Sequence, residues 1–261
     1  MLEEVARKEF ANGVVYALRT SKGYLIETTD TFLPAYTKDA VGLGQNNLVS
    51  DDLGSRKERW MIGVSTMSGC PVGCKFCATG AMKKCHILSS EDIVAQVEFV
   101  VAQRQEKFGD AFEHKINYTR MGEPFLNIEN VKKAISTIDK LFPNTHHYIS
   151  TIGIQGADYS WIKDNITLQV SVHSLSNEKR DWLIPYKNKV SLEEIGKIRT
   201  ESLNKTTVNM TLVDESDFDI KELKRVFDKE HFFIKLSPIN PNCISESNNL
   251  GNGVIQSVNI I

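Results

Sequence analysis

Three cysteines lie within one short segment and are the residues in this sequence most able to do chemistry. They are Cys70, Cys74 and Cys77, separated by three and then two residues. Gly69 and Gly73 permit the backbone turns that would bring the three thiols together. Three thiolates can hold three irons of a [4Fe–4S] cluster and leave the fourth iron open to bind another molecule. Reduction of such a cluster could then pass an electron to a bound sulfonium and break a carbon–sulfur bond.

A structural zinc site is the alternative interpretation of the same cysteines. Zinc normally takes four closed ligands, and Cys85 or His86 could supply the fourth. The spacing of the three cysteines, the aromatic Phe76 before the last of them and the strand–helix series that follows favour the cluster. Three clustered cysteines in a total of five also favour a metal or cluster in a reducing compartment over a disulfide framework.

Strands and helices are predicted to alternate after about residue 60, which is typical of a parallel sheet with right-handed crossovers. A capping box of Ser89 and Asp92 is predicted to open the first helix. The pattern predicts an α/β fold, a partial (βα)6 TIM-like barrel with its chemistry at the C-terminal ends of the strands. The expected strands are 60–66, 115–119, 146–152, 167–173, 206–213 and 232–237. The expected helices are 90–107, 128–141, 157–163, 178–183, 191–203 and 218–229.

Three regions are expected along the chain. Residues 1–59 form an N-terminal β extension, in which 13–19 and 23–28 are predicted as a hairpin and 34–58 mostly as loop. Residues 60–241 form the partial barrel. Residues 242–261 form a polar tail with an abrupt apolar end, which leaves a truncated strand, a docking segment or an incomplete chain as alternatives.

The composition is that of a soluble protein. Hydrophobic residues make up 41% and charged residues 25%, and the formal net charge is −2. This balance lacks the basic excess that marks strong nonspecific nucleic-acid binding. Neither a signal peptide nor an apolar run of about 20 residues is visible, so we expect a cytoplasmic protein without a membrane partner.

The cysteine loop resembles the signature of the radical S-adenosylmethionine (SAM) enzymes. Within that superfamily, the chain resembles the 23S ribosomal RNA adenine methyltransferases over about residues 60–241. The resemblance rests on segments that occur in the same order as in the family. They are 68–80, 121–127, 149–153, 170–174, Arg180 with Pro185, and 237–241.

The resemblance implies two cofactors, a [4Fe–4S] cluster on Cys70, Cys74 and Cys77 and a SAM molecule. It also implies an electron donor such as flavodoxin or ferredoxin. Gly122 and Glu123 would meet the methionine amino group of SAM, since a glycine allows close approach and a carboxylate accepts from an ammonium. The other positions that match SAM contacts are Ser150, Ser171, Val172, His173 and Asn240.

Two further residues are candidates for catalysis. Glu27 matches the position of a glutamate that the family is thought to use as a proton acceptor, although the spacing after it differs. An edge-strand surface carboxylate is the alternative. Arg120 replaces a glycine of the family just before Met121, and its guanidinium could pair with a carboxylate or phosphate.

The sequence departs from the family at the cysteines that transfer the methyl group. The family carries one such cysteine seven positions before the first cluster cysteine, where this chain has Gly63. A second cysteine near the family's C-terminus and an N-terminal accessory domain are expected to be missing here. Cys85 and Cys243 are expected to be structural thiols, although a methyl-transfer route through one of them is an alternative.

Three functions therefore stay open. The favoured one is reductive cleavage of SAM to a 5′-deoxyadenosyl radical that abstracts hydrogen from an unknown substrate, with RNA among the candidates. The second is RNA adenine methylation with a diverged cysteine arrangement. The third is a non-enzymatic binding module stabilised by zinc or a cluster.

Overall fold

The computed structural model describes residues 2–34, 53–82, 84–211, 219–237 and 239–250. These residues form two compact units, and each is made of segments that are separate in the sequence. Unit 1 comprises residues 1–66, 88–120 and 129–147. Unit 2 comprises residues 67–87, 121–128 and 148–261. No helix among the described residues has the length and apolar character needed to cross a bilayer.

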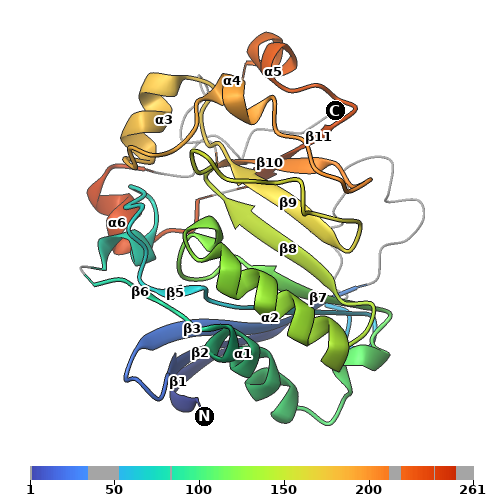
Figure 1. Cartoon of the computed structure of the whole chain (residues 1–261). Helices are drawn as coiled ribbons and strands as arrows, with labels where there is room; N and C mark the ends of the chain where they lie inside the picture. Colours follow the sequence, from blue (N-terminus) through green and yellow to red (C-terminus); the bar gives the residue numbers. More distant parts are fainter. Residues whose placement is uncertain (1, 35–52, 83, 212–218, 238, 251–261) are drawn as a thin grey trace. The chain divides into compact units, whose positions relative to one another are not determined.

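Unit 1 is built on five strands that neighbour one another in the order β1-β2-β3-β4-β7. The first four are antiparallel, and β7 runs parallel to β4. Figure 1 shows β1, β2 and β3 in blue beside α1. The bounds are β1 Glu3–Phe10, β2 Gly13–Arg19, β3 Leu25–Leu33, β4 Arg59–Gly63, β7 Glu113–Tyr118, α1 Ser90–Ala102 and α2 Ile128–Leu141.

Unit 2 carries most of β8, whose first two residues belong to unit 1, and all of β9, β10 and β11. These strands neighbour one another in the order β8-β9-β10-β11. Strand β10 is parallel to both of its neighbours. A separate antiparallel pair, β5 with β6, lies on either side of the cysteine loop. The bounds are β5 Met67–Ser68, β6 His86–Ile87, β8 His146–Thr151, β9 Ile166–Ser171, α3 Asn177–Leu183, α4 Leu192–Ile195, β10 Thr206–Thr211, α5 Ile220–Val226, β11 Phe232–Ser237 and α6 Cys243–Ser247.

Local signals in the sequence predicted several elements well. Helix α2 and strand β11 have the predicted bounds, and β7, β8, β9 and β10 begin and end within two residues of theirs, although the last two residues predicted for β10 lie outside the described residues. Strand β4 begins one residue before its predicted start and ends three residues before its predicted end. The capping box is confirmed, since the Ser89 side chain accepts from the Asp92 N–H and the Asp92 carboxylate accepts from Ser89. Apolar faces with buried Val131, Ile135 and Ile138 explain why α2 was visible from its periodicity.

Other predictions of secondary structure were wrong. Residues 157–163 form an irregular segment with a turn at Ser160 and Trp161. The Asp158 carboxylate accepts from the backbone and hydroxyl of Ser160 and so favours an Asx-type turn over a helix. The helices expected at 90–107, 191–203 and 218–229 are shorter. A third strand, β1, was missed in the N-terminal extension. Most of the loop predicted at 34–58, and the end of the polar tail, lie outside the described residues.

Candidate functional site

The cysteine loop lies between β5 and a short 3-10 helix, Ala78–Ala81, in unit 2. Gly69 has a φ of +83°, and a Cβ there would lie 2.4 Å from the Lys84 carbonyl oxygen, so this turn requires glycine. The Cys77 N–H donates to the Cys74 carbonyl at 3.2 Å and closes the turn between the last two cysteines. All five cysteines are free thiols. The loop is therefore a tight turn that carries three available sulfur donors.

The three thiols influence one another electrostatically. The pKa of the Cys70 thiol is raised to about 12, chiefly by burial and to a smaller extent by Glu123, Cys77 and Cys85, while a hydrogen bond from the Val72 backbone opposes the rise. Burial also raises the pKa of Cys74, and the neighbouring Cys77 and Cys70 raise it by smaller amounts. Within the described residues, however, no three His, Cys, Asp or Glu side chains converge as a preformed metal site. The loop thus places the three sulfur donors in one turn, but their side chains do not converge on a common point.

Helices α3 and α6 of unit 2 are both linked to the cysteine loop by hydrogen bonds. The Lys75 N–H donates to the carbonyl of Leu183, at the end of α3, at 2.9 Å. Asn242 and Asn248, at the two ends of α6, donate from Nδ2 to the carbonyls of Phe76 and Lys75, each at 3.0 Å. Figure 1 shows α6, in red, beside the loop.

The start of the predicted polar tail is therefore a helix, because Asn242 caps it by accepting from the N–H groups of Ile244 and Ser245. Cys243 is the first residue of this helix and is exposed. Cys85 is half-buried, with its sulfur close to Gly69.

Gly122 and Glu123 lie in the turn after β7 in a conformation that depends on the glycine. Gly122 has a φ of +104°, and a Cβ there would lie 2.7 Å from the Cβ of Met67. Glu123 is buried, and its two carboxylate oxygens accept from the N–H groups of Phe125 at 3.1 Å and Ile152 at 2.9 Å. Burial raises the pKa of Glu123 to about 7, although a hydrogen bond from Thr151 opposes this rise. Glu123 therefore links the 122–126 turn to the end of β8.

His173 follows β9 and packs against the cysteine loop. Its ring contacts that of Phe76 in a T-shaped arrangement, with the centroids 4.8 Å apart. Its Nδ1 accepts from the Thr211 N–H at 3.0 Å, so the ring is neutral with its proton on Nε2. The backbone φ is +62°.

A pH dependence of stability follows from this burial. Burial lowers the pKa of His173 from 6.5 to about 3, so the unfolded chain binds a proton that the folded chain does not. The free energy of unfolding of the cluster-free protein should fall as the pH decreases from 6.5 towards 3. His173→Asn tolerates the positive φ and lacks this titration, so its thermal melts should depend less steeply on pH over that range. Equal slopes for the parent and the variant would contradict this.

The other predicted SAM-binding positions also lie in unit 2. Ser150 is a half-buried residue of β8, and Ser171 is a half-buried residue at the end of β9. Val172 is buried, and its N–H donates to the Asn209 carbonyl. Asn240 is exposed, and its carbonyl accepts from Asn242 Nδ2 at 2.9 Å. Their roles towards SAM stay predictions.

The two predicted catalytic residues meet in unit 1. The Arg120 guanidinium donates through one NH2 group to the Glu27 carboxylate, and each side chain is about one-third exposed. Burial lowers the pKa of Arg120. The carboxylate that Arg120 was expected to find is thus Glu27 of its own chain.

Gly63 lies beside this ion pair. It is the direct partner of Thr29 in the β3–β4 ladder, and an added Cβ would lie 2.3 Å from Thr29 Oγ1. The same Cβ would lie 3.0 Å from Cδ and 3.2 Å from Cγ of Arg120. The side chains of Thr29 and Arg120 therefore fill the space that a side chain at position 63 would need.

A buried amide network fixes the backbone next to Glu27, and no local sequence pattern predicted it. Gln96 Oε1 accepts from the Ser65 N–H and from the Thr28 hydroxyl, both at 2.8 Å, and Gln96 Nε2 donates to the Ser65 carbonyl. The Ser65 hydroxyl in turn donates to the Glu27 carbonyl at 2.6 Å. Since Gln96 is fully buried and satisfied, α1 holds β3 against the segment after β4.

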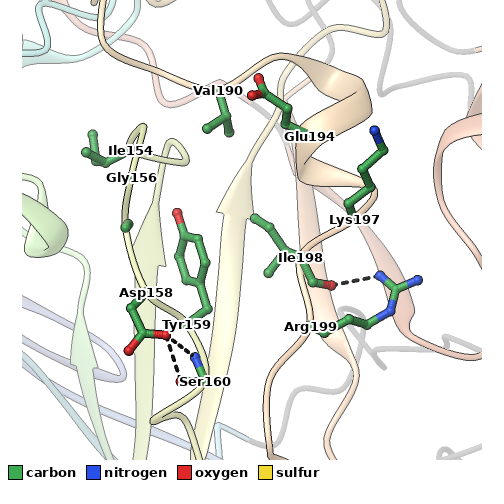
Figure 2. Close-up of a pocket in the computed structure, with 11 residues that line it drawn as sticks. Ile154, Gly156, Asp158, Tyr159, Ser160, Val190, Glu194, Lys197, Ile198 and Arg199 are labelled. Carbon is green, nitrogen blue, oxygen red and sulfur yellow. Dashed lines mark hydrogen bonds between the residues drawn. The ribbon is translucent and has the colours of Figure 1, made fainter.

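A cavity of about 310 Å³ lies elsewhere in unit 2, and none of the predicted site residues lines it. Figure 2 shows the Tyr159 ring between the 154–158 loop and Ile198, with its hydroxyl directed towards the end of the cavity where Ile154 and Val190 lie. Lys197, Glu194 and Asp158 contribute charged groups of both signs. Because its lining combines apolar side chains with charges of both signs, the cavity does not indicate one class of ligand.

The fold is α/β, and one tight turn of it carries three free thiols. The profile of the Radical SAM superfamily matches residues 64–227, and the chain belongs to this superfamily. The match confirms the predicted fold class and family resemblance.

Curated relatives include a probable dual-specificity RNA methyltransferase RlmN from Thermotoga petrophila, 32% identical over 218 residues. That match covers 78% of this chain and 62% of the relative. The protein of the same name from Chlorobium phaeobacteroides is 30% identical over 250 residues, covering 91% of this chain and 69% of the relative. A crystal structure of a radical SAM methyltransferase from Sphaerobacter thermophilus is similar in fold, with a TM-score of 0.66 and 22% identity, covering 92% of this chain and 67% of that one.

Proposed function

We propose that this chain binds a [4Fe–4S] cluster through Cys70, Cys74 and Cys77 and cleaves SAM reductively. The donor set fits the group, since three free thiols share one tight turn in a member of the radical SAM superfamily. When bound, the cluster would deliver an electron from an external donor to the SAM sulfonium, which breaks the C5′–S bond and yields methionine and a 5′-deoxyadenosyl radical. That radical would take a hydrogen atom from the substrate to become 5′-deoxyadenosine.

The residues of this chain would bind and orient SAM. We assign Gly122 and Glu123 to the methionine amino group, with Ser150, the 171–173 segment and Asn240 as further contacts. The positive φ of Gly122 and the close approach of Met67 both require glycine at this position, and they fix the turn that presents Glu123. The hydrogen bonds to Glu123 from Phe125 and Ile152 would hold its carboxylate in one orientation.

The packing around Gly63 favours hydrogen abstraction over a two-cysteine methyl transfer. The resemblance places a methyl-transfer cysteine of the family at this position, and here the space for any side chain is filled by Thr29 and Arg120. The packing of Thr29 and Arg120 around Gly63 is the observation that supports hydrogen abstraction over methyl transfer. Glu27 and Arg120, which pair with each other in unit 1, stay candidates for a proton acceptor and a cation on the family resemblance.

The test is an anaerobic assay of 5′-deoxyadenosine by mass spectrometry. The reconstituted protein, reduced with dithionite in the presence of SAM, should form 5′-deoxyadenosine. The variant with alanine at Cys70, Cys74 and Cys77 should form none. Iron and sulfide analysis is the accompanying measurement, and a parent protein that holds zinc without iron or sulfide would support a zinc-stabilised binding module instead.

RNA adenine methylation is the second candidate, because the curated relatives are named as RNA methyltransferases. Incubation of the reduced protein with ribosomal RNA and methyl-labelled SAM distinguishes the two. Label in RNA adenine would establish methylation by a route that does not use a cysteine at position 63. The absence of label together with 5′-deoxyadenosine formation supports hydrogen abstraction.

A further inference from the structure

Arg180 is a buried cation whose neighbours do not balance its charge. It lies on α3 and is 1% exposed. Its NH1 donates to the Val190 carbonyl at 2.6 Å and its NH2 to the Ile152 carbonyl at 2.5 Å. Its Nε, which is also buried, has no hydrogen-bond partner among the described residues. The guanidinium therefore meets only neutral acceptors.

A guanidinium in such surroundings is stabilised by an anion nearby, because burying an uncompensated charge is strongly unfavourable. No described carboxylate forms an ion pair with Arg180. The adjacent Asp181 acts on it from a distance, but this side chain is 69% exposed and pairs with Lys189 at 2.5 Å. The structure thus contains a buried positive charge without a buried partner.

The cysteine loop would be a second source of negative charge for Arg180 once its thiols are deprotonated by a bound cluster. A Cys74 thiolate, like the Asp181 carboxylate, would raise the pKa of Arg180. The helix that carries Arg180 also holds the loop, since the Leu183 carbonyl accepts from the Lys75 N–H. In the same region, Phe76 packs against the neutral His173, which adds no competing cation.

We propose that Arg180 is the buried counter-charge of the iron–sulfur cluster, a positioning residue that raises its reduction potential. This inference rests on the proposed cluster. Three thiolates outweigh the charge of an oxidised core, so the site is negative and becomes more negative on reduction. A buried cation stabilises the reduced form more than the oxidised form, because Coulomb energies are large where water is excluded.

The experiment measures the midpoint potential of the reconstituted protein in an EPR-monitored redox titration. Arg180→Gln keeps hydrogen-bond donors but removes the charge. We expect its equilibrium constant for reduction to fall about tenfold, which is about 59 mV for one electron. Arg180→Lys keeps the charge, and its potential should stay close to that of the parent. Arg199→Gln is the matched control, since Arg199 is exposed and also donates to backbone carbonyls.

Arg180→Gln could also act only by weakening the fold. Melting temperatures of the parent and the variant, each measured with and without the cluster, distinguish this from an effect on the cluster. If Arg180 balances the cluster, loading should raise the melting temperature of Arg180→Gln less than that of the parent. If Arg180 only links Ile152 to Val190, Arg180→Gln should lower the melting temperatures of the cluster-loaded and cluster-free protein equally and leave the midpoint potential unchanged. That result would contradict this inference and leave the proposed function standing. A parent protein that assembles no cluster would overturn the inference together with the proposed function.

Discussion

A cysteine introduced at position 63 is expected to destabilise the protein by about 1–3 kcal/mol, the usual cost of overpacking. Its Cβ would overlap Thr29 Oγ1 and press on the Arg120 stem. Thr29 lies directly across the β3–β4 ladder, so the backbone cannot move away without breaking the register. Movement of the Arg120 stem would also disturb its ion pair with Glu27. Urea unfolding of the cluster-free protein measures the change.

The control for this prediction is Gly109→Cys. A Cβ at Gly109 meets nothing within 4 Å, so the same chemical change there should have little effect on stability. In a Thr29→Ala, Arg120→Gly background, Gly63→Cys should cost much less stability relative to that background than it does in the parent, because both obstructing side chains are then gone. If Gly63→Cys alone is as stable as Gly109→Cys, the space at position 63 is free and the packing argument against a cysteine there is wrong.

Asp30→Ala is expected to have the largest effect on the stability of unit 1. Asp30 on β3 is fully buried, and its carboxylate accepts from Arg56, from Arg104 at 2.6 Å and from Trp60 Nε1 at 2.8 Å. Arg104 also donates to the Tyr16 hydroxyl. Removal of the carboxylate would leave two guanidinium groups and an indole N–H without their common acceptor. Breaking a buried ion pair on one side typically costs about 3–5 kcal/mol.

The matched control is Glu4→Ala, which removes the exposed ion pair of Glu4 with Arg7 on β1. Solvent screens that pair, so we expect little measurable change in the urea midpoint. Asp30→Asn should lie between the two, since it keeps an acceptor but loses the charge. An Asp30→Ala midpoint equal to that of Glu4→Ala would show that the buried network adds nothing to stability.

Local features of the sequence were enough to predict the cysteine loop and much of the fold. The spacing of Cys70, Cys74 and Cys77 was enough to predict them as cluster donors, because such a site depends on residues of one short loop; their role stays a prediction. The Ser89–Asp92 capping box and the apolar face of α2 were also visible, since hydrogen bonds and periodicity over a few residues define them. The short helix at Cys243–Ser247 could have been signalled by its Asn242 cap.

The secondary structure of segments that lack a clear local sequence pattern depends on contacts that the sequence does not show. Strand β1 is nearly all exposed and lacks the alternation of apolar residues that marks a half-buried strand, so only its pairing with β2 shows it. Residues 157–163 have a composition compatible with a helix, but the Asp158 side chain competes for backbone groups.

The sequence by itself determined which residues could hold a cluster and which family they resemble. The tertiary structure decided what surrounds them. That Arg120 pairs with Glu27, that Thr29 and Arg120 fill the space beside Gly63, and that Arg180 is buried without a carboxylate partner all depend on contacts between distant segments. Burial and charge balance are properties of those contacts, so no local spacing in the chain could show them.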